Sequence, residues 1–169
     1  SSWTSGNFIT LKALGIGSGD EVITTPMSFI ATSNTIIHTG AKPIFVDVEK
    51  ETGNIDASKI ESAITKRTRA IMPVHLYGQM CDMNAIHKIA KKYNLYVIED
   101  SAHCIEGKRD KVRPGQLGTA AVFSFYATKN ITCGEGGAIV TDDKKLYDKL
   151  LKYRLHGMSK GASERHTSI

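Results

Sequence analysis

The chain has 169 residues, of which 41% are hydrophobic and 23% are charged. These proportions are typical of one globular domain and exclude a disordered chain, a coiled coil and a collagen-like repeat. The formal net charge of +5 would suit an anionic partner, but acidic residues are interspersed among the basic ones, and Asp110 interrupts even the densest basic run, residues 108–113. We therefore expect a solvated loop there and no binding of nucleic acid.

The cysteines and the apolar runs indicate the compartment. Cys81, Cys104 and Cys133 form no Cys-x-x-Cys pair and match no zinc spacing, so reduced thiols in a cytoplasmic protein are expected. No apolar stretch is long enough to cross a bilayer, and the first residues lack the pattern of a signal peptide. The sequence therefore predicts a cytoplasmic protein that does not associate with membranes.

Strand and helix patterns alternate along the chain. A helical pattern over residues 7–14 comes first and ends at the glycine-rich segment 15–19. Strands are then predicted at residues 21–25, 43–48, 69–74, 95–98, 121–125 and 138–141. Helical apolar spacing recurs at residues 58–64, 83–90 and 146–151. This alternation predicts an α/β domain with a mostly parallel sheet and helices on both faces, which binds ligands where the strands end.

The glycine-rich segment 15–19 invites comparison with a dinucleotide-binding fingerprint. That fingerprint must follow a strand and open a helix. Here the predicted helix comes first and the predicted strand follows, so we expect a helix end and a loop instead of a nicotinamide site.

Two charged residues stand directly after apolar strands. Asp100 follows the run at 95–98, and Lys129 follows the run at 121–125. In a parallel sheet the two side chains would lie on the same rim, and the glycines at 134–137 would allow a tight turn near a ligand. From these residues alone, Asp100 could equally cap a helix, Lys129 could be an exposed loop residue, and the glycines could form a simple hairpin turn. A metal site made of Asp100, His103 and His75 has no supporting motif, and we expect none.

Several segments in a fixed order carry a resemblance to a known family. The most specific are residues 97–103 (VIEDSAH) and 123–130 (FSFYATKN). Further matches lie at residues 19–23, 40–47, 73–78 and 134–141. Over essentially its whole length, the chain resembles the DegT/DnrJ/EryC1/StrS family of sugar aminotransferases. Within that family it looks most like the branch that aminates UDP-4-keto-pentoses for lipid A modification.

The resemblance implies a fold and an activity. The fold would be the large domain of a fold type I transferase dependent on pyridoxal 5′-phosphate. The activity would be transfer of an amino group, from glutamate, to a keto sugar on a nucleotide diphosphate. The chain would be a fragment, with residues 1–169 forming the cofactor-binding domain, truncated at both ends and without the C-terminal small domain. Each active site would be built by two subunits of a homodimer.

The resemblance also assigns roles to residues around the cofactor ring. Lys129 would hold pyridoxal phosphate as a Schiff base and then move the proton between the substrate and the cofactor. Asp100 would face the pyridine nitrogen and keep it protonated. His103 would pack on or beside the ring, and Phe29 would stack on the opposite face.

Three hydroxyl residues would bind the cofactor's phosphate. Thr4 and Ser5 match the family's phosphate-binding turn at a helix N-terminus, and Ser124 would add a further hydroxyl. Trp3 departs from the family pattern, which more often has a small residue at that position.

Two alternative functions remain open. A sugar dehydratase of the same fold would resemble this chain, but that branch has histidine in place of the Schiff-base lysine, so Lys129 favours the transaminase. A truncated or non-catalytic domain that only binds pyridoxal phosphate is the second alternative.

Overall fold

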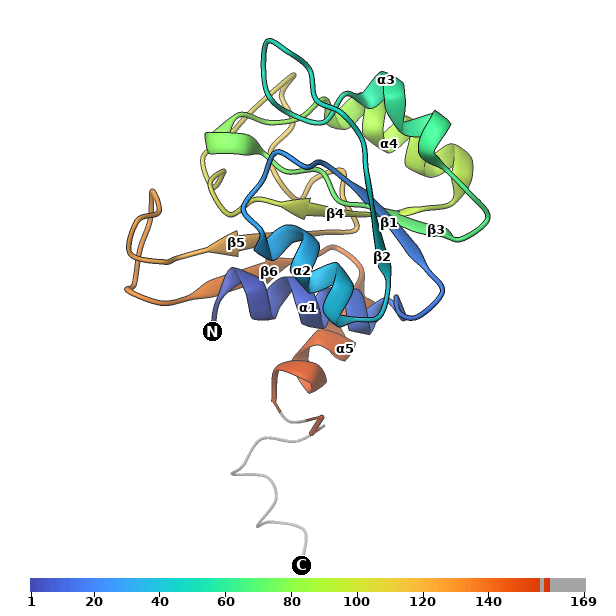
Figure 1. Cartoon of the computed structure of the whole chain (residues 1–169). Helices are drawn as coiled ribbons and strands as arrows, with labels where there is room; N and C mark the ends of the chain where they lie inside the picture. The colour runs from blue at the N-terminus through green and yellow to red at the C-terminus, as the bar shows by residue number, and fades with distance from the viewer. Residues whose placement is uncertain (156, 159–169) are drawn as a thin grey trace, which may run out of the picture.

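The computed structural model describes residues 1–155 and 157–158, so the end of the predicted 1–169 domain, residues 156 and 159–169, lies outside the described residues. A six-stranded sheet in the order β2-β1-β3-β4-β5-β6 forms the centre of the chain (Figure 1). The strands are β1 (Glu21–Thr24), β2 (Lys42–Phe45), β3 (Thr68–Ile71), β4 (Tyr96–Asp100), β5 (Ala120–Ser124) and β6 (Gly137–Val140). Neighbouring strands are parallel except for β5 and β6, which pair antiparallel. The predicted mostly parallel sheet is confirmed, and all six predicted strands are present.

Helices cover both faces of this sheet. They are α1 (Trp3–Ala13), α2 (Ala31–His38), α3 (Ala57–Ile60), α4 (Met83–Tyr93) and α5 (Lys144–Arg154), with two 3₁₀ turns, η1 (Glu61–Ala63) and η2 (Leu76–Gly78). Figure 1 shows α1, α2 and α5 on one side of the sheet and α3 and α4 on the other. Contacts of α1 with β5 and β6, and of α4 with β3 and β4, hold the two layers against the sheet.

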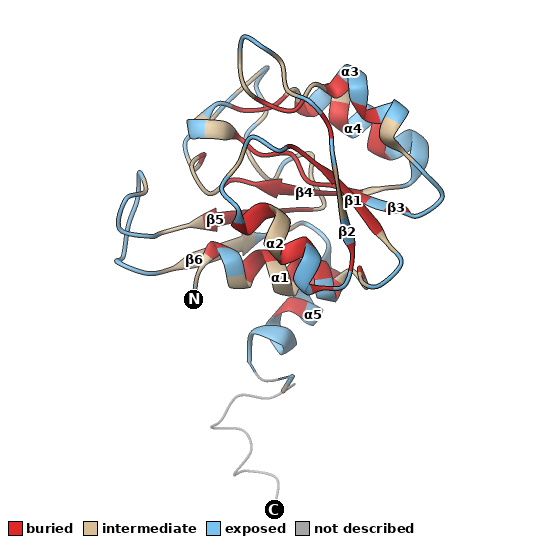
Figure 2. Cartoon of the chain, viewed as in Figure 1, coloured by how far each residue is buried: buried red, intermediate tan, exposed pale blue. Residues whose placement is uncertain are grey.

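The central strands β1, β4 and β5 are buried on both faces because successive side chains point to opposite cores, whereas the edge strands β2 and β6 are partly exposed. In β1, Val22 packs in the core under α1 and α2, whereas Ile23 packs in the core under α3 and α4. Val97 and Ile98 of β4 divide between the two cores in the same way. Figure 2 shows the result as buried central strands between partly exposed helices. The arrangement confirms the predicted α/β layers.

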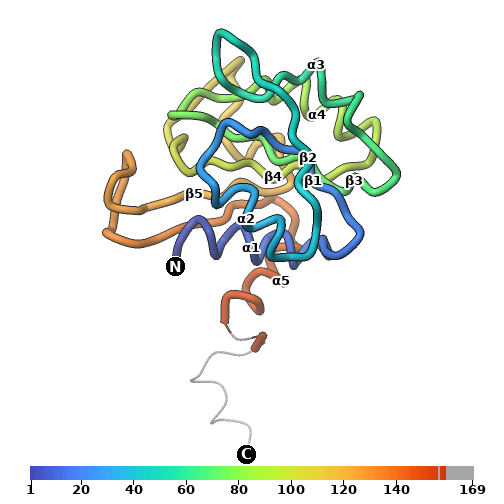
Figure 3. Tube along the Cα trace, viewed as in Figure 1, coloured from blue at the N-terminus to red at the C-terminus, as the bar shows by residue number. Residues whose placement is uncertain are grey.

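Helix α2 was not predicted from the sequence. Three consecutive residues of this eight-residue helix, Thr35, Ile36 and Ile37, have β-branched side chains, which lower its helix propensity. No side chain caps its start. Burial overrides this weak propensity, since Thr35 and Ile36 are fully buried and the helix packs against α1. Figure 3 shows the two helices side by side in the trace.

Several loops and the start of α1 lie at the carboxyl ends of the strands. An isolated bridge between Val74 and Asp100 extends the line of β3 beside the end of β4. In Figure 1 the start of α1 and the long loop between β5 and β6 lie on the left, on the same side as the end of β4. None of the helices in the described part of the chain has the length and apolar character needed to cross a membrane.

Candidate functional site

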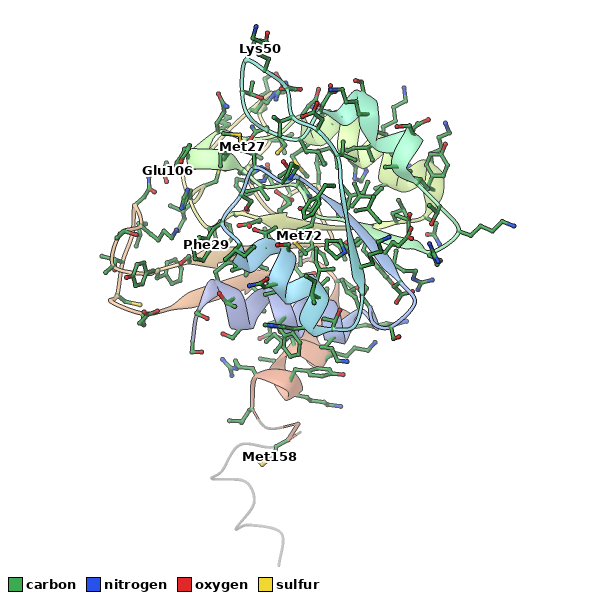
Figure 4. All side chains as sticks on the ribbon, viewed as in Figure 1. Met27, Phe29, Lys50, Met72, Glu106 and Met158 are labelled. Carbon is green, nitrogen blue, oxygen red and sulfur yellow. The ribbon has the colours of Figure 1, made fainter. Side chains whose placement is uncertain are left out.

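One pocket of about 940 Å³ lies at the carboxyl ends of the strands. Its lining comes from residues within 2–4, 26–32, 74–77, 100–103 and 124–135, so five separate segments converge there. Six of the seven residues predicted to bind a cofactor line it: Thr4, Phe29, Asp100, His103, Ser124 and Lys129. Met27 and Phe29, which are labelled in Figure 4, line the pocket from the segment between β1 and α2.

Asp100 is the buried acid of this pocket, with only 5% of its surface exposed. The Thr32 hydroxyl donates to its Oδ2 at 2.9 Å, and the Ala102 N–H donates to its Oδ1 at 3.2 Å. Burial raises the pKa of Asp100 to about 6, against the opposing effect of these two hydrogen bonds and of the nearby Lys129 charge. The carboxylate is therefore held in place but is costly to ionise without a cation facing it.

Lys129 reaches the same pocket from the loop between β5 and β6. The base of the loop is closed because Phe125 donates its N–H to the Gly136 carbonyl and accepts from the Cys133 N–H. A turn then fixes the lysine, since its N–H bonds to the Tyr126 carbonyl at 2.9 Å. Burial lowers the pKa of Lys129, and the charge of Asp100 acts in the opposite direction. The structure thus brings the predicted amine and acid into one pocket.

Aromatic residues form the pocket's walls. His103 stacks on Tyr77 with ring centroids 5.8 Å apart and an interplanar angle of 22°. Burial and the Lys129 cation lower the pKa of His103. Phe29 lines the pocket with 78% of its surface exposed, so its ring is accessible to a ligand. Its predicted stacking role stays a prediction, and Tyr77 was missed because its place in the pocket depends on a local turn.

The start of α1 forms another wall, contributed by Trp3 and Thr4. Ser2 caps the helix and accepts a hydrogen bond from the Ser5 N–H at 3.1 Å. The Ser5 hydroxyl bonds back to the Ser2 backbone, and Ser5 is not among the residues that line the pocket, so its contact with a phosphate stays a prediction. In this capping box, the N–H and the hydroxyl of Ser5 both bond to Ser2. The backbone groups at Trp3 and Thr4 remain at the pocket.

Because Gly137 has no side chain, β6 can approach the start of α1 together with its partner residue Ser124. Ser124 pairs with Gly137 across β5 and β6. A Cβ at position 137 would lie 2.5 Å from the Ser2 carbonyl carbon and 2.8 Å from the Trp3 nitrogen, so only glycine allows the strand to come this close. The glycines at 134–137 were predicted to allow a close approach, and at Gly137 the partner is the start of α1.

A buried hydrogen-bond network supports the pocket from behind. His75 Nε2 lies 2.9 Å from Glu99 Oε2, while His75 Nδ1 accepts from the Cys81 N–H. Because Nδ1 accepts, Nε2 carries the proton and donates it to Glu99. The other Glu99 oxygen accepts from the N–H groups of Gly115 and Gly118. Both ring nitrogens of His75 are thus engaged, and the alternative metal set with Asp100 and His103 is not assembled.

The comparisons with known proteins decide the family. The sequence model of the DegT/DnrJ/EryC1/StrS aminotransferase family matches residues 1–169. The chain belongs to this family. The resemblance inferred from the sequence segments is thereby confirmed, while the particular branch stays a prediction.

Curated relatives share about half of their aligned residues with the chain. The spore coat polysaccharide biosynthesis protein SpsC of Bacillus subtilis is 52% identical over 167 residues, which are 99% of this chain and 43% of the relative. GDP-perosamine synthase of Caulobacter vibrioides is 47% identical over 155 residues, 92% of this chain and 42% of the relative. The chain therefore spans less than half the length of these proteins.

A solved structure gives the same fold. The crystal structure of NtdA from Bacillus subtilis with bound cofactor PMP is 43% identical, covers 90% of this chain and 34% of that chain, and has a TM-score of 0.85. The predicted fold type I large domain is confirmed. Aminotransferases of this family bind pyridoxal phosphate, which confirms the cofactor named from the sequence.

The close contact at Gly137 gives a prediction about cofactor binding. The Gly137→Ala variant is expected to bind pyridoxal phosphate about tenfold more weakly or worse, because the new methyl group pushes β6 away from the start of α1. Equilibrium titration with pyridoxal phosphate measures the change. Gly17→Ala is the matched control, since its Cβ would meet its nearest neighbour at 3.5 Å. Equal affinities of Gly137→Ala and the wild type would contradict the account.

Proposed function

We propose that this chain is the cofactor-binding domain of an aminotransferase that transfers an amino group from glutamate to a keto sugar on a nucleotide diphosphate. The single observation that carries the proposal is the convergence of the Asp100 carboxyl and the Lys129 amine in one pocket, beside the start of a helix. A pyridine ring with an aldehyde and a phosphate needs these three features at different points of its edge.

The residues present fit pyridoxal phosphate. When bound, this cofactor supplies an electron sink for the bonds broken at the amino-bearing carbon. Asp100 would hold a proton on the ring nitrogen, since a buried carboxylate that is costly to ionise gains most from a facing cation. Thr32 and Ala102 orient the two carboxylate oxygens toward that task.

Lys129 would act through its amine in two ways. Nζ would hold the cofactor covalently until the amino donor displaces it. Once released, the neutral amine would take the proton from the donor's carbon and deliver a proton to the acceptor's carbon. Burial favours this neutral form, because it lowers the pKa of Lys129.

The start of α1 would bind the phosphate. Free backbone N–H groups and the helix dipole favour a dianion at an N-terminus. Thr4 and Ser124 line the pocket there and would add hydroxyl donors. Ser5, which also holds the Ser2 cap, is proposed to bind the phosphate as well.

The names of two relatives support the proposal that the acceptor is a keto sugar on a nucleotide diphosphate. GDP-perosamine synthase carries a nucleotide-linked sugar in its name, and SpsC is named for polysaccharide biosynthesis. Lys129 favours amination over the dehydratase alternative. A cytoplasmic location is proposed as well, on the cysteines and the apolar runs of the sequence.

A homodimer and a further small domain are proposed on the resemblance alone. Sedimentation of the full-length protein with cofactor tests the dimer, which a stable loaded monomer would contradict.

Turnover assays test the proposed function. The full-length protein, loaded with pyridoxal phosphate, is given glutamate and UDP-, GDP- and dTDP-linked keto sugars in turn. We expect an amino sugar from one nucleotide class and an equal amount of 2-oxoglutarate. Tight cofactor binding without any amino sugar would instead support the non-catalytic alternative.

A further inference from the structure

We propose that Tyr77 is a specificity-determining residue that contacts the acceptor substrate beyond the carbon that receives the amino group. The inference rests on the proposed function and adds a substrate contact to it. It comes from three features of Tyr77: a constrained backbone, a ring at the pocket's rim and a stack on His103.

The backbone of Tyr77 is in the left-handed region, with φ 51° and ψ 30°. This conformation is unfavourable for a residue with a bulky side chain, and it persists where the surrounding structure imposes it, often at ligand sites. The next residue, Gly78, has φ 87°, and a Cβ there would lie 3.0 Å from the His103 carbonyl oxygen. The turn is therefore pressed against the segment that carries His103.

Hydrogen bonds on either side hold this turn. The Leu76 N–H donates to Asn54 Oδ1 at 3.1 Å, and the His75 N–H donates to the Asp100 carbonyl at 3.0 Å. The Gly78 N–H closes the turn on the His75 carbonyl at 3.2 Å. The end of the strand that provides the buried acid thus also fixes the position of Tyr77.

Tyr77 is 82% exposed although it lines the pocket. One face stacks on His103, whose own titration responds to the charge of Lys129. Tyr77, His103 and Lys129 all line this pocket, and the large exposed fraction of Tyr77 places the tyrosine at its outer part. Its free face and its hydroxyl can pack on a sugar or base ring and form a hydrogen bond.

The two substrates differ in how far they extend from the amine. Glutamate is small, and its reacting carbon must approach Lys129. A nucleotide-linked sugar must place its keto carbon at the same point, so the rest of it extends toward the rim. Tyr77 should therefore affect the reaction with the acceptor and leave the reaction with the donor unchanged.

The test compares Tyr77→Gly, Tyr77→Phe and the wild type in the full-length, cofactor-loaded protein. For Tyr77→Gly we expect kcat/KM for the keto sugar to fall about tenfold or more, as for a lost stacking contact. The single-turnover reaction with glutamate alone should stay within about twofold of the wild type. Tyr77→Phe keeps the ring and should retain most of the acceptor kcat/KM. The Tm of cofactor-free Tyr77→Gly should be unchanged or higher, because glycine relieves the left-handed backbone.

Asp110→Gly is the matched control, because Asp110 has the same φ of 51° in an exposed loop outside the pocket. It should leave both reactions unchanged. If kcat/KM of Tyr77→Gly for the keto sugar stayed within twofold of the wild type, the inference about Tyr77 would be wrong while the proposed function would stand. The same holds if the variant lost activity equally with the keto sugar and with glutamate. A wild type that aminates no keto sugar would contradict the proposed function and this inference together.

Discussion

The Lys129→Ala variant of the full-length protein is expected to lose transamination by about 10,000-fold or more. Alanine would remove both proposed roles of Lys129, the covalent attachment of the cofactor and the base that moves the proton, and the loss of either one has a large effect on the rate. The absorbance band of lysine-bound pyridoxal phosphate should disappear as well. Both readouts are measured on the same preparation, by spectrophotometry and by amino sugar formation.

Lys108→Ala is the control for this experiment, because Lys108 is an exposed lysine outside the pocket. It should keep the band and the activity. Retention of the band in Lys129→Ala would show that another amine holds the cofactor, and the assignment of Lys129 would be wrong.

The Asp100→Asn variant is expected to lose about 100- to 1,000-fold in kcat, while the cofactor-free protein becomes more stable. Asparagine cannot hold a proton on the ring nitrogen electrostatically, and loss of such preorganised charge has effects of this size. The cofactor-free protein gains stability because the substitution removes a buried charge. The pKa of Asp100 is raised from its ordinary value to about 6 by burial, so the ionised carboxylate destabilises the cofactor-free protein.

The pH dependence follows from the direction of this shift. The folded protein binds the proton of Asp100 more tightly than the unfolded chain does, so this group's contribution to stability falls as the pH rises from about 4 to about 6. Above pH 6 the loss is complete, and at pH 7 Asp100→Asn should gain about 3 kcal/mol over the wild type. Below pH 4 the difference should vanish.

Urea denaturation of the cofactor-free proteins at pH 4 and pH 7 measures this effect. Asp110→Asn, at an exposed position, is the control and should match the wild type at both pH values. An Asp100→Asn variant that is less stable than the wild type at pH 7 would contradict the account of the buried acid.

Much of the fold follows from local patterns. Central strands such as β1 and β4 were predictable because their apolar, β-branched runs are buried on both faces. Helix α4 was predictable because Ile86 and Ile89 lie on one buried face. Helix α2 was not, because its stability comes from packing against α1 and not from its threonine- and isoleucine-rich sequence.

The chemical centre of the site was predictable, but its supports were not. Asp100 ends β4 and Lys129 lies in the loop after β5, so the parallel pairing of these two strands brings both residues to one rim. Thr32 and Tyr77 reach the pocket from a helix and a turn whose orientation depends on long-range packing. Ser5 matches a phosphate-binding turn by position and also forms a capping box with Ser2, which the sequence does not distinguish from ligand binding, so its phosphate contact stays a prediction.

The most direct test of the central claim is to locate the lysine that holds the cofactor. Borohydride reduction of the pyridoxal phosphate-loaded protein fixes the cofactor to its lysine, and peptide mass spectrometry then identifies the modified residue. The account predicts a single adduct on Lys129, dependent on Asp100 for full occupancy. An adduct on another lysine, with Lys129 unmodified, would contradict it.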